Sequence, residues 1–341
     1  MGYNDNMDKK KITIIGAGVS GLYLAYLLED KFDIRILEAR KRVGGRIYSI
    51  SGNDMGPSWI WSHQKNVLKL VDALGLELFT QFSEGNALYD TKERLEVFRP
   101  QPSAPSTRIS GTLSQLINKL EAKLQNTQII LDEKVESVQE KHGNRVVRTG
   151  NKEYESDYVI VTLPPRLAAA LVYEPALPQS LKQKMLDTQT WMGASAKCVV
   201  EFSRSFWRDK GLSGFTFSPL GPLGEIHDAS EGDKHALFGF VGVNTDMQDF
   251  QSKVQAQMIR LFDIKKSDIQ GIHLLDWREE LYSSSAEDKK PLNAHPEYGI
   301  DTSEYGDRVL FGATEFSYDN GGYIEGAIVL AQEISEKLHN A

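Results

Sequence analysis

Apolar positions open the chain in the order of a strand, a turn, a helix and a second strand. Residues 12–15 form a short β-branched run, which is typical of a buried parallel strand. Residues 22–30 read LYLAYLLED, which predicts a helix, and the apolar residues of 34–37 predict another strand. The order therefore predicts a βαβ unit at the start of the chain.

The rest of the chain alternates shorter strand-like runs with a few amphipathic helices. Helices are expected at about 66–75, 111–124, 249–262 and 324–338. Strands are expected at 95–98, 128–131, 135–138, 145–148, 157–162, 194–202, 206–207, 211–218, 237–243, 272–277 and 308–311. Pro100, Pro102 and Pro105 interrupt regular structure, and we place a domain junction there.

Composition and charge exclude several classes of protein. The net charge of −8 argues against a nucleic-acid partner, which calls for a basic surface. Glycines interrupt the apolar stretch 12–28, so we expect no membrane span, and the polar N-terminus lacks the apolar core of a signal peptide.

The single cysteine, Cys198, cannot form an intramolecular disulfide and fits a reducing, cytoplasmic location. We expect no metal site, and interpret His227-Asp228 and His295-Pro-Glu297 as turn or surface polar groups.

The turn between the first strand and helix carries the glycine spacing of a dinucleotide-binding site. Gly16 permits the tight turn, Gly18 lets the backbone approach a pyrophosphate, and Gly21 lets the helix pack closely on the strand. Glu38 ends the second strand, where its carboxylate can accept hydrogen bonds from a ribose. This acid would repel the 2′-phosphate of NADP, while NAD and FAD both remain open.

A second glycine motif follows directly. The segment from Glu38 to Arg46 ends in Gly44-Gly45-Arg46 and resembles the second glycine motif of the glutathione-reductase-like FAD proteins. The resemblance implies that Glu38 binds the adenosine ribose and that the Gly-Gly-Arg turn lies along the flavin and pyrophosphate. Arg46 is a suitable charge partner for phosphate. The motif therefore favours FAD.

Four segments together resemble the flavin-containing monoamine and polyamine oxidases, over most of the chain. They are the N-terminal block with GPSW at 56–59, SDYVIVTLPPRLAAALVYEPALP at 156–178, WMGASAKCVVEFSRSFW at 191–207 and VLFGATEFSYDNGGYIEGAIVLAQEI at 309–334. The chain is thereby identified as a compact, bacterial-type member of this family. The resemblance implies an FAD-dependent oxidase of small-molecule amines, with O2 as electron acceptor and H2O2 as product.

The same resemblance implies roles for three residues in the reaction. Lys197 matches the lysine that contacts the flavin N5 through a water; the alternative is a lysine on a strand surface. Trp277 matches a tryptophan near the flavin ring, although a core tryptophan is an alternative. Tyr323 matches one wall of an aromatic cage that can hold an amine by its polar and π character.

Residues from all of these motifs are expected to hold FAD. They are Gly16, Gly18, Val19, Ser20, Gly21, Glu38, Ala39, Arg40, Gly44, Gly45, Arg46, Gly56, Pro57, Ser58, Trp59, Val135, Thr162, Leu163, Trp277, Gly312, Ala313, Glu315, Gly322, Tyr323, Ile324 and Ala327.

Two departures from the family pattern concern the substrate side. Ala286 occupies the position of the cysteine that joins FAD covalently in some members, so we expect non-covalent FAD. Glu287 falls where the second cage aromatic is expected, and Tyr282 could replace it. The lid of the family is short here, at residues 79–108, so the site is either more open or completed by a second subunit in a homodimer.

The expected fold is α/β, with an inserted substrate domain of α+β type. A glutathione-reductase-like Rossmann domain binds FAD and comprises 1–78, 109–186 and 282–341. A mixed-sheet substrate domain comprises 79–108 and 187–281. Two other functions stay open: a renalase-like oxidase or desaturase of a non-amine substrate such as a reduced nicotinamide, and a flavin-stabilised binding or assembly protein with little turnover.

Overall fold

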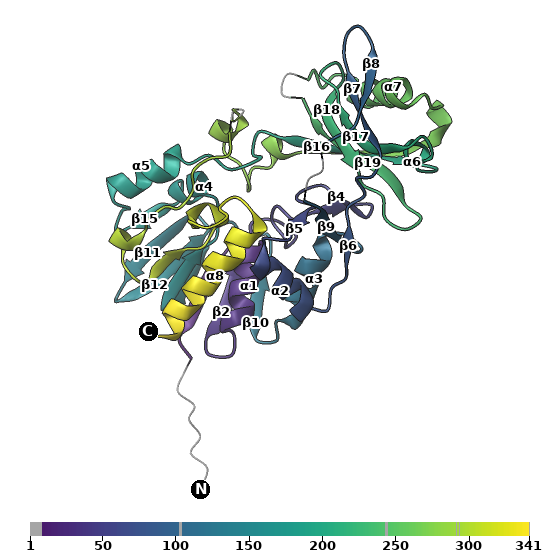
Figure 1. Ribbon diagram of the computed structural model, residues 1–341. Helices are drawn as coiled ribbons and strands as arrows, with labels where there is room; N and C mark the ends of the chain where they lie inside the picture. Colours follow the sequence, from purple (N-terminus) through teal and green to yellow (C-terminus); the bar gives the residue numbers. More distant parts are fainter. Residues whose placement is uncertain (1–8, 102–103, 243–244, 291, 293, 341) are drawn as a thin grey trace.

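A five-stranded parallel sheet forms the centre of the first half of the molecule (Figure 1). The computed structural model describes residues 9–101, 104–242, 245–290, 292 and 294–340. The sheet has the order β10-β2-β1-β14-β21. Its strands are β1 (Lys11–Ile15), β2 (Asp33–Leu37), β10 (Thr127–Ile130), β14 (Tyr158–Val161) and β21 (Val309–Phe311). Every pairing is parallel, so the carboxyl ends of the strands meet at one edge.

Helices and a small second sheet cover the two faces of this sheet. The helices that share its larger core are α1 (Val19–Leu28), α2 (Lys65–Ala73), α3 (Ser114–Lys123) and α8 (Ile324–His339). The other face carries a four-stranded sheet, β13-β12-β11-β15, with its own core. Its elements are β11 (Ser137–Lys141), β12 (Asn144–Thr149), β13 (Lys152–Ser156), β15 (Val172–Glu174), α4 (Pro165–Ala169) and α5 (Gln179–Asp187). This is the predicted glutathione-reductase-like arrangement.

A seven-stranded mixed sheet, β20-β16-β19-β18-β17-β7-β8, forms the second half of the molecule. Its strands are β7 (Asn86–Asp90), β8 (Leu95–Phe98), β16 (Ala196–Phe202), β17 (Leu212–Phe217), β18 (Leu223–Asp228), β19 (His235–Val241) and β20 (Ile269–Asp276). β17 and β7 are parallel and the other pairs antiparallel. The predicted mixed sheet of the substrate half is therefore confirmed.

The two faces of the seven-stranded sheet have different neighbours. Helices α6 (Phe206–Asp209) and α7 (Phe250–Phe262) pack on one face, where Cys198 and Val200 of β16 are fully buried. Lys197 and Val199 alternate with them and point to the opposite face. That opposite face looks toward the five-stranded sheet.

Short elements connect the two halves. They are β3 (Ser49–Ile50), β4 (Asn53–Asp54), β5 (Ile60–Trp61), β6 (Leu78–Thr80), β9 (Ser106–Ile109) and the 3-10 turns η1 (Lys266–Asp268), η2 (Trp277–Glu279), η3 (Ala286–Lys289), η4 (Ser303–Tyr305) and η5 (Thr314–Phe316). Figure 1 places β4, β5, β6 and β9 between the two large sheets.

The structure corrects several predicted elements. Phe206 and Trp207 begin a short helix and not a strand, because both rings are buried against the core under α7. β11 begins two residues later than predicted, so Val135 precedes the strand. Residues 79–108 do not form a separate lid, since hairpin β7–β8 extends the edge of the seven-stranded sheet.

Other elements were absent from the prediction altogether. β7, β13, β18 and α5 were missed. Pro102, in the predicted domain junction, and residue 243, at the end of a predicted strand, lie outside the described residues. The predicted domain boundaries stay a prediction.

Candidate active site

A cavity of about 1110 Å³ opens between the carboxyl ends of the five-stranded sheet and the free face of the seven-stranded sheet. It exceeds the roughly 300–1,000 Å³ of common small-ligand pockets. The predicted residues that line it are Gly16, Gly18, Val19, Ser20, Glu38, Ala39, Arg40, Gly44, Gly45, Arg46, Gly56, Pro57, Ser58, Trp59, Val135, Thr162, Leu163, Lys197, Trp277, Ala313, Gly322, Tyr323, Ile324 and Ala327. Gly21, Gly312 and Glu315 are not among its lining residues.

The glycine turn after β1 forms one end of the cavity. Gly16 has φ +105°, a conformation that favours glycine. Gly18 is the N-cap residue of α1 and offers no side chain to the first backbone N–H groups, which stay available to an anion. Gly21 lies behind the turn, where a Cβ atom would meet the carbonyl oxygen of Gly16 at 2.1 Å. Gly21 therefore brings α1 close to β1, as predicted for the third glycine.

Glu38 is held at the end of β2 by two backbone donors. Its carboxylate accepts hydrogen bonds from the N–H groups of Ala17 at 2.8 Å and Arg40 at 2.9 Å. The guanidinium of Arg40 donates to Glu280 at 3.1 Å and to Ser283 at 2.7 Å. Arg40 thereby ties the loop that follows β20 to this end of the cavity.

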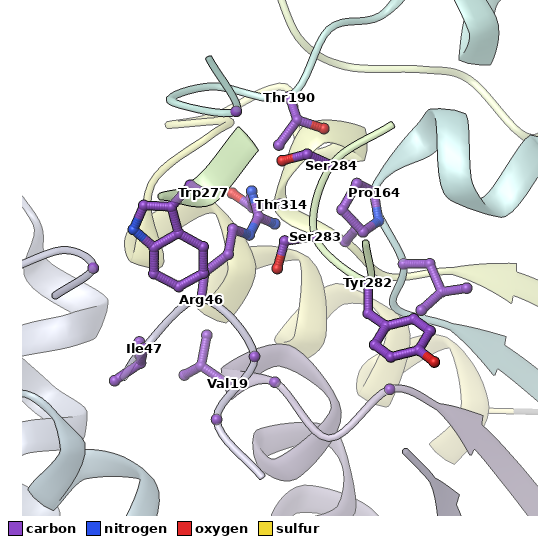
Figure 2. Close-up of a pocket in the computed structure, with 18 of the residues that line it drawn as sticks. Val19, Arg46, Ile47, Pro164, Thr190, Trp277, Tyr282, Ser283, Ser284 and Thr314 are labelled. Carbon is purple, nitrogen blue, oxygen red and sulfur yellow. The ribbon is translucent and has the colours of Figure 1, made fainter. Parts of the chain in front are cut away.

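Tyr282 is part of this loop and lies beside Arg40. The guanidinium stands over the tyrosine ring, 5.5 Å from its centroid. Figure 2 shows Tyr282 and Trp277 on opposite sides of the close-up, with Arg46 between them. Among the described residues Tyr282 makes no ring contact with Tyr323, and the exposed Glu287 pairs with Lys290. Glu287 does not line the cavity, whereas Tyr282 does, and its role as the second cage aromatic stays a prediction.

Arg46, in the cavity wall, forms an ion pair with Glu315 behind it. The two side chains meet through contacts of 2.5 and 3.2 Å, and Glu315 is fully buried. Burial alone would lower the pKa of Arg46, but the Glu315 carboxylate outweighs it and raises this pKa. Arg46 points into the cavity near Trp277 and Thr314 (Figure 2). Glu315 does not line the cavity itself, but its carboxylate keeps the guanidinium of Arg46 charged.

Two hydrogen bonds join neighbouring elements at the carboxyl edge of the five-stranded sheet. The Ser20 hydroxyl donates to the carbonyl oxygen of Gly312, which joins the start of α1 to the end of β21. The Thr162 hydroxyl donates to the carbonyl oxygen of Ile15 at 2.8 Å and joins β14 to β1. Gly312 thus supports the cavity through its backbone without lining it.

Lys197 projects from β16 into the other end of the cavity and is 4% exposed. Its Nζ atom donates to the Gly56 carbonyl oxygen at 2.9 Å and to Ser58 Oγ at 2.7 Å. It also stands 4.2 Å from the centroid of the Phe238 ring. Burial lowers the pKa of Lys197 to about 7, although the Asp54 carboxylate acts in the opposite direction. The predicted lysine is therefore buried and tethered, and not a lysine on a strand surface.

Trp277 adjoins the same Gly-Pro-Ser-Trp segment. Its indole N–H donates to the Met55 carbonyl oxygen at 2.8 Å. A Cβ atom at Gly56 would meet the Arg46 carbonyl oxygen at 2.0 Å and the Trp277 ring at 3.4 Å. Gly56 therefore lets Arg46, Trp277 and Lys197 converge on one place.

Tyr323 stands at the N-cap of α8 in an aromatic group that the sequence reasoning missed. Its ring lies parallel to the imidazole of His295, with centroids 5.1 Å apart and 3° between the planes. Trp61 meets it edge-on at 6.2 Å and also lines the cavity. Trp61 lies two residues after Trp59 of the GPSW segment, and this position was its one signal in the sequence.

The substrate-side wall also contains a pair of polar residues. His227 lies between the rings of Phe215 and Phe238, at 5.0 and 5.4 Å, and its Nε2 donates a hydrogen bond of 2.6 Å to the Glu225 carboxylate. Glu225 lines the cavity. The interpretation of His227 as a turn or surface group is therefore wrong. Both residues lie on β18, a strand that was not predicted.

Comparisons with known proteins decide the family. A family model described as "Flavin containing amine oxidoreductase" matches residues 19–108 and 93–338, which is most of the chain. The chain belongs to this family.

Known relatives of this flavin-containing amine oxidoreductase match it over nearly its whole length. Flavin-containing amine oxidase B of Homo sapiens is 22% identical, and the alignment covers 98% of this chain and 87% of that protein. Cyclohexylamine oxidase from Brevibacterium oxydans IH-35A has a TM-score of 0.82 at 17% identity, covering 97% of this chain and 100% of that chain. Putrescine oxidase bound to putrescine has a TM-score of 0.80 at 17% identity, covering 98% and 99%.

The cofactor of this amine oxidoreductase is FAD, and the cavity fits it. The uncapped start of α1 suits a pyrophosphate, the Glu38 carboxylate a ribose, and the cavity extends from there to Lys197. The only cysteine, Cys198, is fully buried on the far face of β16 and does not line the cavity, so it cannot bond to the flavin. The FAD is therefore held non-covalently.

The described residues contain neither a candidate membrane span nor a candidate metal site. In the described part of the chain no helix is long and apolar enough to cross a membrane. The same residues contain no group of three histidine, cysteine or acidic side chains that could hold a metal ion.

Proposed function

We propose that this chain oxidises a small amine to an imine, that water hydrolyses the released imine, and that O2 is the electron acceptor and leaves as H2O2. When bound, FAD supplies the acceptor for the hydride from the amine-bearing carbon and passes the electrons to oxygen. The observation that carries the proposal is the convergence of Lys197, Trp277 and Tyr323 on one cavity that begins at the dinucleotide turn.

The residues proposed to hold FAD follow the length of the cavity. The backbone from Gly16 to Ser20 would meet the pyrophosphate, and Glu38 the adenosine ribose. Arg46, kept charged by Glu315, would meet a phosphate or the polar edge of the flavin ring. Tyr282 and Arg40 would close over the adenosine end.

Lys197 is proposed to act on water and oxygen beside the flavin. An ammonium group has three donors, and two are engaged by Gly56 and Ser58. The third is available to a water molecule in the cavity. Because its pKa is about 7, Lys197 Nζ can hold or release a proton near neutral pH.

Tyr323 and Trp61 are proposed to hold the reacting amine. Their rings stand perpendicular to one another at 6.2 Å, so they offer a face and an edge to a substrate carbon that bears nitrogen. Hydride loss from a neutral amine leaves an iminium ion, which passes its proton to water to give the imine, so no strong general base is needed to start the reaction. Trp61 would thus extend the aromatic wall formed by Tyr323.

The comparisons support amines over the two other functions considered. The printed names of the matched structures are an oxidase of cyclohexylamine and an oxidase bound to putrescine. Neither a reduced-nicotinamide oxidase nor a non-enzymatic flavoprotein is favoured by the family match.

The test is anaerobic mixing of the yellow holoprotein with a panel of amines, followed by visible flavin absorbance. We expect an amine to bleach the flavin, and air to restore the colour with formation of H2O2. If no amine bleaches the flavin but a reduced nicotinamide does, the proposal is wrong.

A further inference from the structure

Two connections of the chain between its halves meet beside the cavity. The first connection leads from α5 to β16, and its residues 190–193 line the cavity. The second leaves β20, and its residues 281–284 line the cavity as well. A Cβ atom at Gly193 would meet Ser284 Oγ at 3.2 Å and Asp288 Cβ at 3.1 Å, so the two connections are in contact. Figure 2 shows Thr190 of the first beside Ser284 of the second.

Residues 280–288 of the second connection, here called the strap, form an outer wall of the cavity. Leu281 and Tyr282 line the cavity and are nevertheless 73% and 38% exposed, so the strap lies between the cavity and solvent. Apart from the short turn η3, this described stretch contains no helix or strand. Its position therefore depends on side-chain contacts at its two ends.

Asp288 fastens the second end of the strap. Its carboxylate is fully buried, and one oxygen accepts hydrogen bonds from the Thr190 N–H group and from Arg166, both at 2.8 Å. The other oxygen accepts from the N–H and hydroxyl groups of Ser285, at 2.8 and 2.7 Å. Arg166 belongs to α4 and also donates to the Leu186 carbonyl oxygen of α5 at 2.7 Å. Asp288 therefore joins the strap to the first connection and to the FAD-binding half.

Arg40 fastens the first end of the strap. Its guanidinium donates to Glu280 at 3.1 Å and to Ser283 at 2.7 Å. The Glu280 side chain is partly exposed, whereas Asp288 is fully buried, so the ion pair of Asp288 with Arg166 is the stronger fastening. Both fastenings use groups of the protein alone, and they can therefore form before FAD binds.

We propose that Asp288 is a positioning residue that holds the strap across the bound FAD, and that FAD enters and leaves the cavity only when the strap opens. An FAD molecule that lies along the cavity is behind the strap, because Leu281 and Tyr282 separate the cavity from solvent. The proposal concerns the cofactor and does not depend on which substrate is oxidised.

The experiment measures FAD exchange in both directions by flavin fluorescence. Dilution of the holoprotein gives the rate constant of FAD release, and addition of FAD to the apoprotein gives the rate constant of capture. We expect both constants to rise at least about tenfold in Asp288→Asn, as for the loss of a charge-assisted hydrogen bond. Glu287→Gln is the matched control and should change neither constant, because Glu287 is exposed on the same strap, bonds Lys290 and does not line the cavity.

The capture rate distinguishes a strap from an ordinary FAD contact. A strap that opens more easily speeds both directions, whereas a lost contact to FAD speeds release alone. Faster release with unchanged capture, or no change in either constant, would therefore overturn the proposal. Neither measurement requires turnover, so failure of amine oxidation would leave this test intact.

A second variant decides the matter if Asp288→Asn does not fold, which thermal unfolding of the apoprotein shows. Glu280→Gln weakens the partly exposed fastening to Arg40 and should raise both constants by a smaller factor, about two- to fivefold. Unchanged constants in a folded Glu280→Gln would then overturn the proposal.

Discussion

Lys197 Nζ donates a hydrogen bond of 2.7 Å to Ser58 Oγ. This bond joins the seven-stranded sheet to the Gly-Pro-Ser-Trp segment, and both line the cavity. The two residues are 139 positions apart in the sequence. This bond, with the one to Gly56, orients a buried ammonium group that has Phe238 beneath it. The lysine is therefore placed by partners from both halves of the molecule.

Replacement of Lys197 by Met should slow flavin reduction or reoxidation while FAD stays bound. We expect a loss on the order of a hundredfold, the size usual for a positioned polar group. Stopped-flow absorbance measures the two half-reactions separately, and Lys253→Met, on the solvent side of α7 and outside the cavity, is the control. Unchanged rates in both half-reactions would remove Lys197 from the reaction.

Lys197 should also make stability depend on pH. Its pKa is about 7 in the folded protein and 10.5 ordinarily, so between these values the unfolded chain binds more protons. The free energy of unfolding should therefore rise with pH across this window, by at most ~1.4 kcal/mol per pH unit. Denaturant titrations of wild type and Lys197→Met at pH 7 to 10 measure the difference, which should shrink as pH rises because Met carries no burial penalty. A difference that is flat with pH would contradict the lowered pKa.

Glu315→Gln should weaken FAD binding and stability. The substitution leaves the Arg46 guanidinium in the cavity wall without its buried counter-ion, at a cost of about 3 kcal/mol. Thermal unfolding and FAD titration by flavin fluorescence measure both effects. Glu96→Gln removes an exposed ion pair and should change stability by less than about 0.5 kcal/mol. Equal effects of the two substitutions would show that Arg46 does not depend on Glu315.

Trp61→Leu should raise KM for the amine and leave the flavin spectrum unchanged. The substitution removes the edge-on partner of Tyr323, and an aromatic contact of this type contributes about 0.5–1.5 kcal/mol, or roughly three- to tenfold in affinity. Steady-state kinetics give KM and kcat separately. Tyr26→Leu, an exposed aromatic residue on α1, is the control. A wild-type KM in Trp61→Leu would place the amine elsewhere in the cavity.

The cofactor end could be predicted from the sequence because its contacts are local. Gly16, Gly18 and Glu38 lie within one βαβ unit, where strand, turn and helix each have their own signal. Lys197 was found through its flanking motif, since a lone lysine on a strand has no distinctive pattern. The cofactor-binding positions depend on the local backbone conformation, and residues close by in the sequence determine that conformation.

The substrate end could not be predicted because its contacts are long-range. Glu225 and His227 lie on β18, a six-residue strand whose alternation of glycine, charged and apolar residues is too weak to read. Their significance depends on pairing with β19, which in turn pairs with β16. His295 reaches Tyr323 from a loop without regular structure. Only the assembled sheet brings these side chains to one wall.

The orientation of Cys198 affects which sulfur atom of the protein the proposed product, H2O2, can oxidise. The thiol points away from the cavity into the core under α7, and burial raises its pKa to about 12. Peroxides attack the thiolate, so the one sulfhydryl of the chain is shielded from oxidation during turnover. Two thioethers line the cavity, those of Met55 and Met192; Met55 is fully buried, whereas Met192 is partly exposed and so open to H2O2. Ageing of a working preparation should therefore appear as sulfoxide at the active site, which added thiol reductants do not prevent.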